Sequence, residues 1–164
     1  MRKVVVTEFL TLDGVMEAPE EWQFPYWNDE IEKFKHNELF ASDAQLLGRV
    51  TYQGFADAWP SQTGEYADRL NSLPKYVVST TLKKVEWNNS RLIKEKIAET
   101  ISELKRQPGQ DILVHGSRTL VQTLMQYNLI DEYNLMIHSV ILGKGKRLFS
   151  DGMTASLKLT RRSR

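Results

Sequence analysis

Residues 111–117 read Asp-Ile-Leu-Val-His-Gly-Ser, and this stretch decides the class of fold. Its apolar run at 112–114 has no polar alternation, which is typical of a strand buried on both faces of a parallel sheet. Gly116 and Ser117 then end the strand, and apolar residues at helical spacing continue to Tyr127. A buried strand that runs directly into a helix is the repeating unit of α/β proteins.

The same alternation of strand and helix extends along the rest of the chain. We expect further strands at Val4–Leu10, Ala44–Arg49, Tyr76–Thr80, Arg91–Ile93, Tyr133–Ile137, Val140–Leu142 and Ser156–Thr160. We expect helices at Val50–Ala58, Tyr66–Leu73 and Glu95–Arg106, and one that is capped by Asn28 or Asp29 and turns Ile31, Phe34 and Phe40 inward. Because repeated strand–helix units connect by right-handed crossovers, the sequence predicts an α/β fold with a mostly parallel central sheet flanked by helices.

The composition indicates a single globular domain over residues 1–164. A chain of this length buries roughly 70% of its unfolded surface and needs no disulfide or metal to hold its core. The absence of cysteine excludes a thiol nucleophile, an iron–sulfur cluster and a cysteine zinc site. Glu8 interrupts the apolar run near the N-terminus, and no run approaches the length of a membrane span, so we expect a cytoplasmic protein with no membrane partner.

The net charge of +1 hides a gradient along the chain. Met1–Asp43 holds four basic and ten acidic residues, whereas Leu135–Arg164 holds seven basic and one acidic. Only the basic end supports a nucleic-acid partner, and it offers few aromatic rings beyond Phe149 to stack on bases. We therefore expect no nucleic-acid partner.

Three of the expected strands end in residues that suit an anion. Gly116, Ser117 and Arg118 join a strand to a helix, where backbone N–H groups, a hydroxyl and the positive helix end converge. Gly48–Tyr52 and Ser79–Thr81 follow two further strands and add a guanidinium and several hydroxyls. Ligands in such sheets bind at the carboxyl ends of the strands, so these residues indicate a phosphate-binding edge. For each segment, the alternative is an ordinary capped helix start or a solvated charge.

Other patterns are absent or open to two interpretations. The sequence has no G-x-G-x-x-G, no P-loop and no nucleophile elbow. Its three histidines are too scattered for a metal site, so we expect no metal. We interpret Gly143–Arg147 as a hairpin connection in preference to a phosphate loop. The aromatic stretch Trp22–Trp27 either stacks on a planar ring or packs as a lid on the core.

Six short blocks follow one another over nearly the whole chain: Thr11–Gly14, Gly48–Tyr52, Val78–Thr81, Val114–Ser117, Leu129–Glu132 and Leu142–Phe149. In this order they resemble the dihydrofolate reductase-like superfamily, and most closely its RibD C-terminal branch, the reductase domains of riboflavin biosynthesis and their small stand-alone relatives. The resemblance implies a three-layer α/β fold with an antiparallel C-terminal part. Because the relatives continue beyond Leu157–Leu159 into a last strand, we expect that part to be truncated or altered here.

The resemblance also implies NADPH as cofactor, bound across the strand ends. It would place Gly48, Arg49 and Thr51 beside the cofactor phosphates, Ser79, Thr80 and Thr81 along the 2′-phosphate region, and Gly116, Ser117, Arg118, Thr119 and Leu120 around the pyrophosphate. It would turn Asp13, Trp22 and Trp27 toward the nicotinamide and the substrate, with Asp13 as the catalytic proton donor.

These features together predict an NADPH-dependent reductase that acts by hydride transfer on a small pyrimidine- or pterin-like heteroaromatic substrate. The cofactor carries such a reaction, so no protein nucleophile is required. The alternative is a non-catalytic nucleotide-binding or dimeric interaction protein that keeps the fold without turnover. A homodimer would also cover a sheet edge left open by a shortened C-terminal part.

Overall fold

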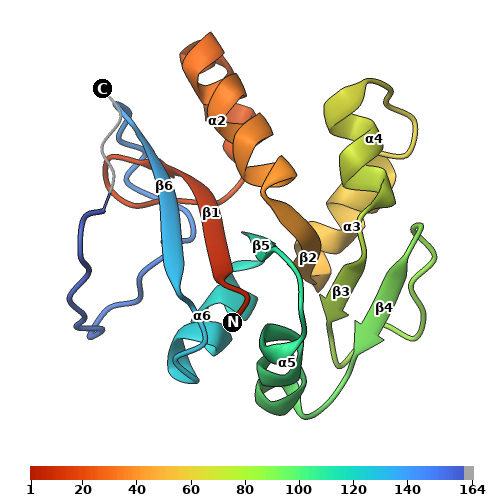
Figure 1. Cartoon of the computed structure of the whole chain (residues 1–164). Helices are drawn as coiled ribbons and strands as arrows, with labels where there is room; N and C mark the ends of the chain where they lie inside the picture. Colours follow the sequence, from red (N-terminus) through yellow and green to blue (C-terminus); the bar gives the residue numbers. More distant parts are fainter. Residues whose placement is uncertain (161–164) are drawn as a thin grey trace.

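Six parallel strands form one sheet at the centre of the computed structural model, which describes residues 1–160 (Figure 1). The strands are β1 (Val4–Thr11), β2 (Ser42–Gly48), β3 (Lys75–Val78), β4 (Ser90–Ile93), β5 (Asp111–Gly116) and β6 (Glu132–His138). Their spatial order is β4-β3-β2-β5-β1-β6, and every neighbouring pair runs parallel. The carboxyl ends of all these strands therefore lie along the same edge of the sheet.

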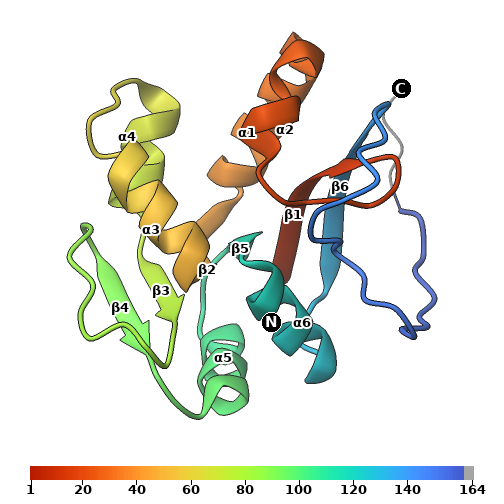
Figure 2. The same cartoon turned by 180° about the vertical axis from the view of Figure 1, so that it is seen from behind.

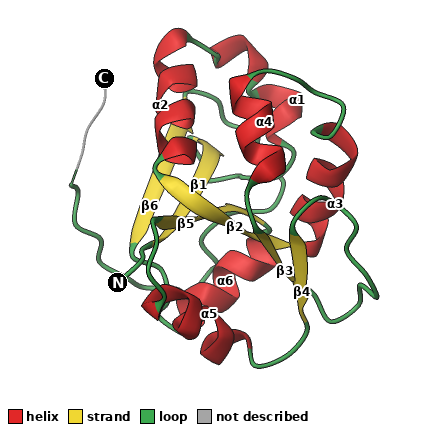
Figure 3. Ribbon diagram, turned by 45° about the vertical axis from the view of Figure 1, so that its right-hand side comes forward, coloured by secondary structure: helices red, strands yellow, loops and turns green. Residues whose placement is uncertain are grey.

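Helices cover both faces of this sheet (Figure 2, Figure 3). One face carries α2 (Asp29–Phe40), α3 (Arg49–Ala58) and α4 (Glu65–Ser72), and the other carries α5 (Ile97–Arg106) and α6 (Arg118–Gln126). The short α1 (Pro19–Trp22) and a 3₁₀ turn at Phe24–Tyr26 lie between β1 and α2. The prediction of a three-layer α/β fold is confirmed. None of the helices within residues 1–160 is long and apolar enough to cross a membrane.

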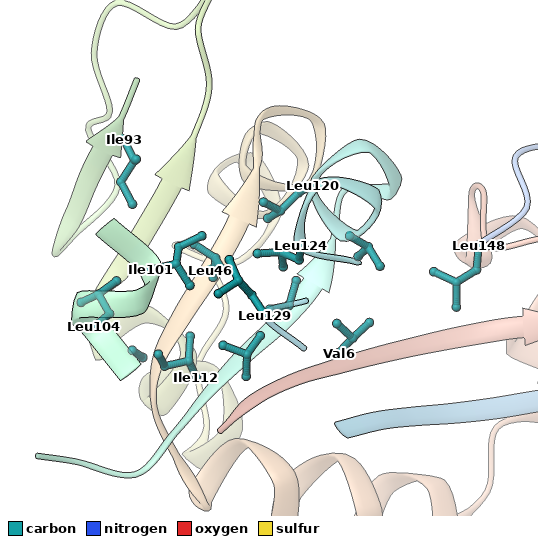
Figure 4. Close-up of a cluster of buried hydrophobic side chains, with 14 of the residues drawn as sticks. Val6, Leu46, Ile93, Ile101, Leu104, Ile112, Leu120, Leu124, Leu129 and Leu148 are labelled. Atoms are coloured by element: carbon teal, nitrogen blue, oxygen red, sulfur yellow. The ribbon is translucent and has the colours of Figure 1, made fainter. Parts of the chain in front are cut away.

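Alternating side chains of the central strands supply two hydrophobic cores. Val4 and Val6 of β1 pack in the core that α5 and α6 close, together with side chains such as Leu124 (Figure 4). Val5 points to the opposite face and packs in the core that includes Leu39 of α2. The three valines are at most 4% exposed. Helices on both faces thus explain why β1 is a continuous apolar run in its first half.

Two of the expected strands, Val140–Leu142 and Ser156–Thr160, are wrong. Neither segment pairs with the sheet, which ends at β6 in the part of the chain that the structure describes. The alternating apolar residues of the second segment reach no core, because Leu157 and Leu159 are 59% and 75% exposed. The last four residues of the basic end, 161–164, lie outside the described residues.

The segment after β6 folds back over the strand ends. The carbonyl oxygen of Val140 accepts a hydrogen bond from the Leu12 N–H at 2.8 Å, and one antiparallel bridge joins Val15 to Arg147. Residues 143–147 therefore lie against the loop that follows β1, and the expected hairpin is wrong. The expected antiparallel C-terminal part is reduced to this single bridge among the described residues.

The buried face of α2 differs from the expected one. Ile31, Phe34 and Phe40 are only half-buried, whereas Lys35 and Glu38 are buried together with Leu39. The helix begins as predicted, since the Asn28 side chain accepts a hydrogen bond from the Ile31 N–H at 2.9 Å. The predicted helix is therefore correct, but its predicted buried face is wrong. This helix presents a lysine and a glutamate to the sheet.

Candidate functional site

The carboxyl ends of β2 and β5 touch at two glycines. A Cβ atom on Gly48 would lie 2.1 Å from Ser117 Oγ and 2.8 Å from the Ser117 backbone nitrogen, so no larger residue fits there. Gly116 has φ +139°, a conformation that other residues rarely adopt, and a Cβ on it would lie 2.7 Å from Thr51 Oγ1. The Gly116–Ser117 peptide bond is cis. Glycine is therefore required on both sides of this contact.

This contact brings the N-termini of α3 and α6 side by side. Gly48 precedes α3 and offers no side chain to cap it. At α6, the Ser117 hydroxyl accepts from the Leu120 N–H at 3.4 Å and the Ser117 carbonyl accepts from the Val121 N–H at 3.0 Å. The N–H groups of the first two residues of α6 are left for another partner. Because the N-terminal ends of both helix dipoles are positive, an anion is stabilised where they meet. We call residues 48–51 and 116–120 the anion cradle.

The charged and apolar members of the cradle have different surroundings. Arg49 is exposed, and its guanidinium donates to Gln53 Oε1 at 3.2 Å. Arg118 donates through Nε to the Arg147 carbonyl oxygen at 2.6 Å. Thr119 is exposed, whereas the side chain of Leu120 is a core residue with 3% exposure. Leu120 can therefore contribute only its backbone to a ligand, and that N–H is already held by Ser117.

Ser79, Thr80 and Thr81 follow β3, which lies next to β2 on the side away from β5. Ser79 is 8% exposed, and its hydroxyl accepts from the N–H groups of Thr81 and Leu82 at 3.2 and 3.1 Å. Its side chain therefore holds the turn, while Thr80 and Thr81 are exposed. The structure thus brings this segment to the same edge as the anion cradle, one strand further along.

Asp13 fastens the segment after β6 to the loop after β1. Its carboxylate accepts from the Thr11 hydroxyl at 2.5 Å, the Gly143 N–H at 2.8 Å and the Leu142 N–H at 3.3 Å. These hydrogen bonds, that from Thr11 first, lower the pKa of Asp13 to about 2. The carboxylate also lies 3.8 Å from the Arg147 guanidinium. The lowered pKa favours the ionised carboxylate, which suits a role in holding the loop.

The two predicted aromatic residues have unequal access to a ligand. Trp22 is 8% exposed, its Nε1 donates to the Glu17 carbonyl at 3.1 Å, and its ring lies edge-on to His138 with centroids 5.3 Å apart. Trp27 is 44% exposed, with its ring centroid 6.3 Å from that of Phe9 in β1. Trp22 therefore serves the lid packing, and Trp27 is the ring available for stacking.

Sequence reasoning missed a set of buried polar groups between β1, α2 and β6. Glu38 accepts from the Thr7 hydroxyl at 2.8 Å and from Asn134 Nδ2 at 3.0 Å, and it forms an ion pair with Lys35. Lys35 Nζ also donates to Thr7 Oγ1 at 3.1 Å. We call Thr7, Lys35, Glu38 and Asn134 the buried charged cluster. The i,i+3 spacing of Lys35 and Glu38 was the one signal available, and it is common on solvated helix faces.

Glu8 is a second group that the sequence did not single out. It lies in β1 beside the anion cradle, because its Oε1 would be 3.7 Å from a Cβ on Gly116. Its side chain is 7% exposed, and Oε1 has no hydrogen-bond partner among residues 1–160. Burial raises the pKa of Glu8 well above its ordinary value, although the Lys35 charge opposes this rise. A neutral carboxyl at this position is therefore favoured.

His115 is the other buried titratable group at this edge. Burial, and then the Lys35 charge, lower its pKa well below the ordinary value of histidine. Its Nδ1 has no hydrogen-bond partner among residues 1–160, and the ring packs 5.4 Å from that of Phe55. His115 is thus a neutral ring packed beneath the edge. In the described part of the chain, no three His, Asp or Glu side chains gather closely enough to hold a metal ion.

A wide surface groove of about 1220 Å³ lies between α3, α4 and the loop 82–88, and one of its lining residues, Gln53, accepts the hydrogen bond from Arg49. Its lining includes Asp57, Asn71 and Lys84 but no member of the anion cradle. None of its lining residues belongs to a strand of the sheet. We therefore assign the candidate site to the strand ends, where independent features converge.

Comparisons with known proteins agree with this fold. The model of the RibD C-terminal domain matches residues 2–163. The uncharacterized protein YyaP of Bacillus subtilis is 31% identical over 162 residues, an alignment that covers 92% of this chain and 81% of YyaP. The uncharacterized protein YwjB of the same organism is 28% identical over 162 residues, covering 96% of this chain and 88% of YwjB.

Solved structures are similar in fold at low sequence identity. A provisionally assigned riboflavin biosynthesis protein from Shewanella sp. PV-4 has a TM-score of 0.75 at 21% identity, covering 93% of this chain and 86% of that one. A deaminase/5-amino-6-(5-phosphoribosylamino)uracil reductase from Thermotoga maritima has 0.64 at 13%, covering 94% and 49%. Dihydrofolate reductase from Enterococcus faecalis, complexed with NADP(H), has 0.57 at 13%, covering 91% and 77%.

Proposed function

The chain belongs to the RibD C-terminal domain family, and on that premise we propose that it is an NADPH-dependent reductase of a small pyrimidine- or pterin-like heteroaromatic compound. The family and the reductases among the similar folds point to an oxidoreductase. The observation that carries the choice of cofactor is the anion cradle. Two helix N-termini that meet at Gly48 and Ser117 suit the two adjacent phosphates of a dinucleotide.

The residues present fit such a cofactor in three respects. Gly48 and Gly116 let β2 and β5 meet closely, so the first N–H groups of α3 and α6 lie near one another. Arg49 is exposed beside the cradle and suits bidentate phosphate binding. Thr80 and Thr81 lie on the β3 side and are exposed, as the 2′-phosphate region requires. We assign the binding roles of Thr51, Ser117, Arg118 and Thr119 to the pyrophosphate, and that of Ser79 to holding the turn.

When bound, the nicotinamide cofactor supplies the hydride. We propose that the chain orients the cofactor and forms the substrate pocket at the β1 end of the site. We propose that Trp27 stacks on the heteroaromatic substrate, since it is the exposed ring near β1. Asp13 contributes by fixing the loop at residues 141–147 beside that pocket, and the contacts of its carboxylate support this role in place of proton donation.

A pair of glycine substitutions tests the cofactor site. Gly48→Ala places a methyl group 2.1 Å from Ser117 Oγ, whereas Gly54→Ala, in the middle of α3, meets no atom within 4 Å. We expect wild type and Gly54→Ala to bind NADPH in a fluorescence titration, and Gly48→Ala to bind at least about tenfold more weakly, which corresponds to roughly 1.4 kcal/mol. Circular dichroism checks that both variants are folded. No binding by wild type at near-millimolar NADPH, or equal binding by both variants, refutes the cofactor assignment.

A second candidate function is binding without turnover, including assembly as a dimer. It is favoured by the open edge at β6, where Ile137 is 63% exposed. A panel of pyrimidine, pterin and flavin-precursor compounds with NADPH oxidation as readout separates the two functions. Oxidation dependent on a panel compound supports the reductase, while NADPH binding without oxidation supports the second candidate. Light scattering of the full chain measures whether it is a dimer.

We also propose that residues 1–164 form one reductase domain, which the family match over residues 2–163 supports. The expectations of a cytoplasmic location, of no nucleic-acid partner and of no metal stay predictions.

A further inference from the structure

The strand order arranges the candidate site as a line. Thr80 and Thr81 follow β3, Gly48 follows β2, Gly116 ends β5, and Glu8 lies in β1 on the far side of Gly116. If the phosphates occupy the cradle and the adenosine end lies toward β3, the reacting end of the cofactor lies toward β1. Glu8 is thus placed at the junction between the cradle and the proposed substrate pocket.

Glu8 has the properties of a reactive group, and it makes no stabilising hydrogen bond through Oε1 among residues 1–160. It is 7% exposed, yet its Oε1 has no hydrogen-bond partner among residues 1–160. An unpartnered carboxyl inside a protein lowers stability, and an apolar side chain of the same size would not. Packing alone therefore gives no reason for an acid at this position, whereas Oε1 lies at the site, 3.7 Å from the place that a Cβ atom on Gly116 would take.

The charges that face Glu8 leave it unpaired. From α2, Lys35 and Glu38 act on it with opposite signs. The Lys35 ammonium is already engaged by Glu38 and by the Thr7 hydroxyl, so it does not form an ion pair with Glu8. From the other packed elements, β5 presents the Gly116 backbone, α3 presents the neutral Thr51 hydroxyl, and β6 pairs through Leu135. Among residues 1–160, Glu8 therefore forms no ion pair with a basic side chain.

Other titratable groups near the site are less suited to giving a proton. Asp13 is ionised at neutral pH by its hydrogen bonds. His115 is neutral, and burial keeps its Nδ1 beneath the sheet edge. Tyr66 has its pKa raised by burial, which makes its hydroxyl a weak acid. Glu8 alone among these combines a buried acid with a position beside the cradle.

We propose that Glu8 is the proton donor of the reduction, a role that rests on the proposed function. Reduction of a C=N or C=O bond adds one hydride to carbon and one proton to the heteroatom. Glu8 gives its proton to the heteroatom as the π electrons of the double bond move there. The resulting carboxylate then regains a proton from water before the next turnover. Apart from the cofactor, which supplies the hydride, no further oxidant or reductant is needed.

Infrared spectroscopy of the full chain tests whether Glu8 carries the proton. The carbonyl stretch of a protonated carboxyl is separate from the bands of carboxylates. We expect this band in wild type at pH 7 and its loss in Glu8→Gln, which has nearly the same shape. Asp111→Asn is the matched control, because Asp111 also has its pKa raised by burial but lies at the opposite edge, at the start of β5. A band at pH 7 that survives in Glu8→Gln, or no such band in wild type, overturns the proposal.

Cofactor affinity supplies a second readout. The oxidised nicotinamide ring is positive and the reduced ring is neutral, so ionised Glu8 favours NADP⁺ over NADPH. For charges about 10 Å apart at an effective dielectric constant near 20, the preference changes roughly tenfold. We expect the ratio of the two dissociation constants to shift toward NADP⁺ as the pH rises through the titration of Glu8, in wild type and Asp111→Asn but not in Glu8→Gln.

The outcomes distinguish this inference from the proposed function. Intact NADPH binding with a ratio that responds to pH equally in wild type and Glu8→Gln overturns only the role of Glu8. Absence of NADPH binding to wild type overturns both. For a panel compound that is reduced, we expect Glu8→Gln to lower kcat and to remove the alkaline limb of its pH profile, with KM for NADPH unchanged.

Discussion

Lys35→Met is the substitution that most directly tests the buried charged cluster. The side chains of Lys35 and Glu38 are 8% and 6% exposed, so water does not replace a lost partner. Methionine fills a similar volume and still packs against the Phe9 ring, although the cation–π contact, in which Nζ lies 5.3 Å from the ring centroid, is lost. The change therefore removes a charge and leaves most of the packing.

The expected cost follows from what Glu38 keeps. Its carboxylate retains hydrogen bonds from Thr7 and Asn134 but loses the ammonium, and removal of one partner from a buried ion pair costs about 3–5 kcal/mol. We expect Lys35→Met to lower the free energy of unfolding in urea at pH 7 by this amount. Glu38→Leu alone leaves the ammonium unpaired and is expected to cost a similar amount.

The double variant Lys35→Met/Glu38→Leu separates the ion pair from general damage to the core. Both charges are then absent, and replacement of a buried pair by apolar residues is often neutral or stabilising. Loss of the acceptor for Thr7 and Asn134 offsets part of this gain, by about 1–3 kcal/mol. We expect the double variant to be more stable than either single variant. Destabilisation equal to the sum of the two single variants would refute the reasoning.

Two further perturbations test single contacts, one at the start of β3, at the edge opposite the site, and one at the loops beside the site. Lys75→Met removes an ammonium that donates to the carbonyls of Asn71, Leu73 and Asn88 at distances between 2.6 and 2.9 Å. We expect the free energy of unfolding in urea to fall by about 1.5–3 kcal/mol. An unchanged free energy of unfolding would contradict this expectation. Asp13→Asn is expected to speed hydrogen exchange of the Gly143 amide at pH 7, because the carboxylate that accepts from this amide is lost. In wild type the pKa of Asp13 is lowered, so this protection should be complete above the ordinary pKa near 3.8 and be lost as the pH falls through about 2. Equal exchange in both proteins at pH 7 would contradict the assignment.

Most of the architecture could be predicted from the sequence because buried parallel strands carry a strong local signal. The run at 112–114 is apolar throughout, and the structure covers it on both faces. Helix limits were predicted to within two residues where a cap or a proline marks them. The expected strand at Ser156–Thr160 failed because alternation describes a strand only when a partner edge and a core are present, and Leu157 and Leu159 have neither.

Some residues of the candidate site could likewise be predicted from local sequence, and others could not. Residues that act through the backbone at a strand–helix turn, such as Gly48 and Gly116, are marked by local sequence, and the structure brings them into contact. Glu8 and Lys35 carry no local mark, because a charged residue in a strand or helix is expected to be solvated. Only the packing of the folded chain removes their water. Prediction of these two residues requires the tertiary arrangement.

The two kinds of residue also have different energetic roles. The anion cradle costs the fold little, since the free N–H groups at the starts of α3 and α6 can bond to water until a ligand arrives. The buried groups lower stability as long as the protein exists, because Glu8 is desolvated without a partner and Lys35 with Glu38 gains little over an apolar pair. Such groups persist in a core where they do chemistry or fix a ligand. The position of Glu8 beside the cradle, with the charges of Lys35 and Glu38 acting on it, is therefore a further reason to place the reaction at the β1 end of this edge.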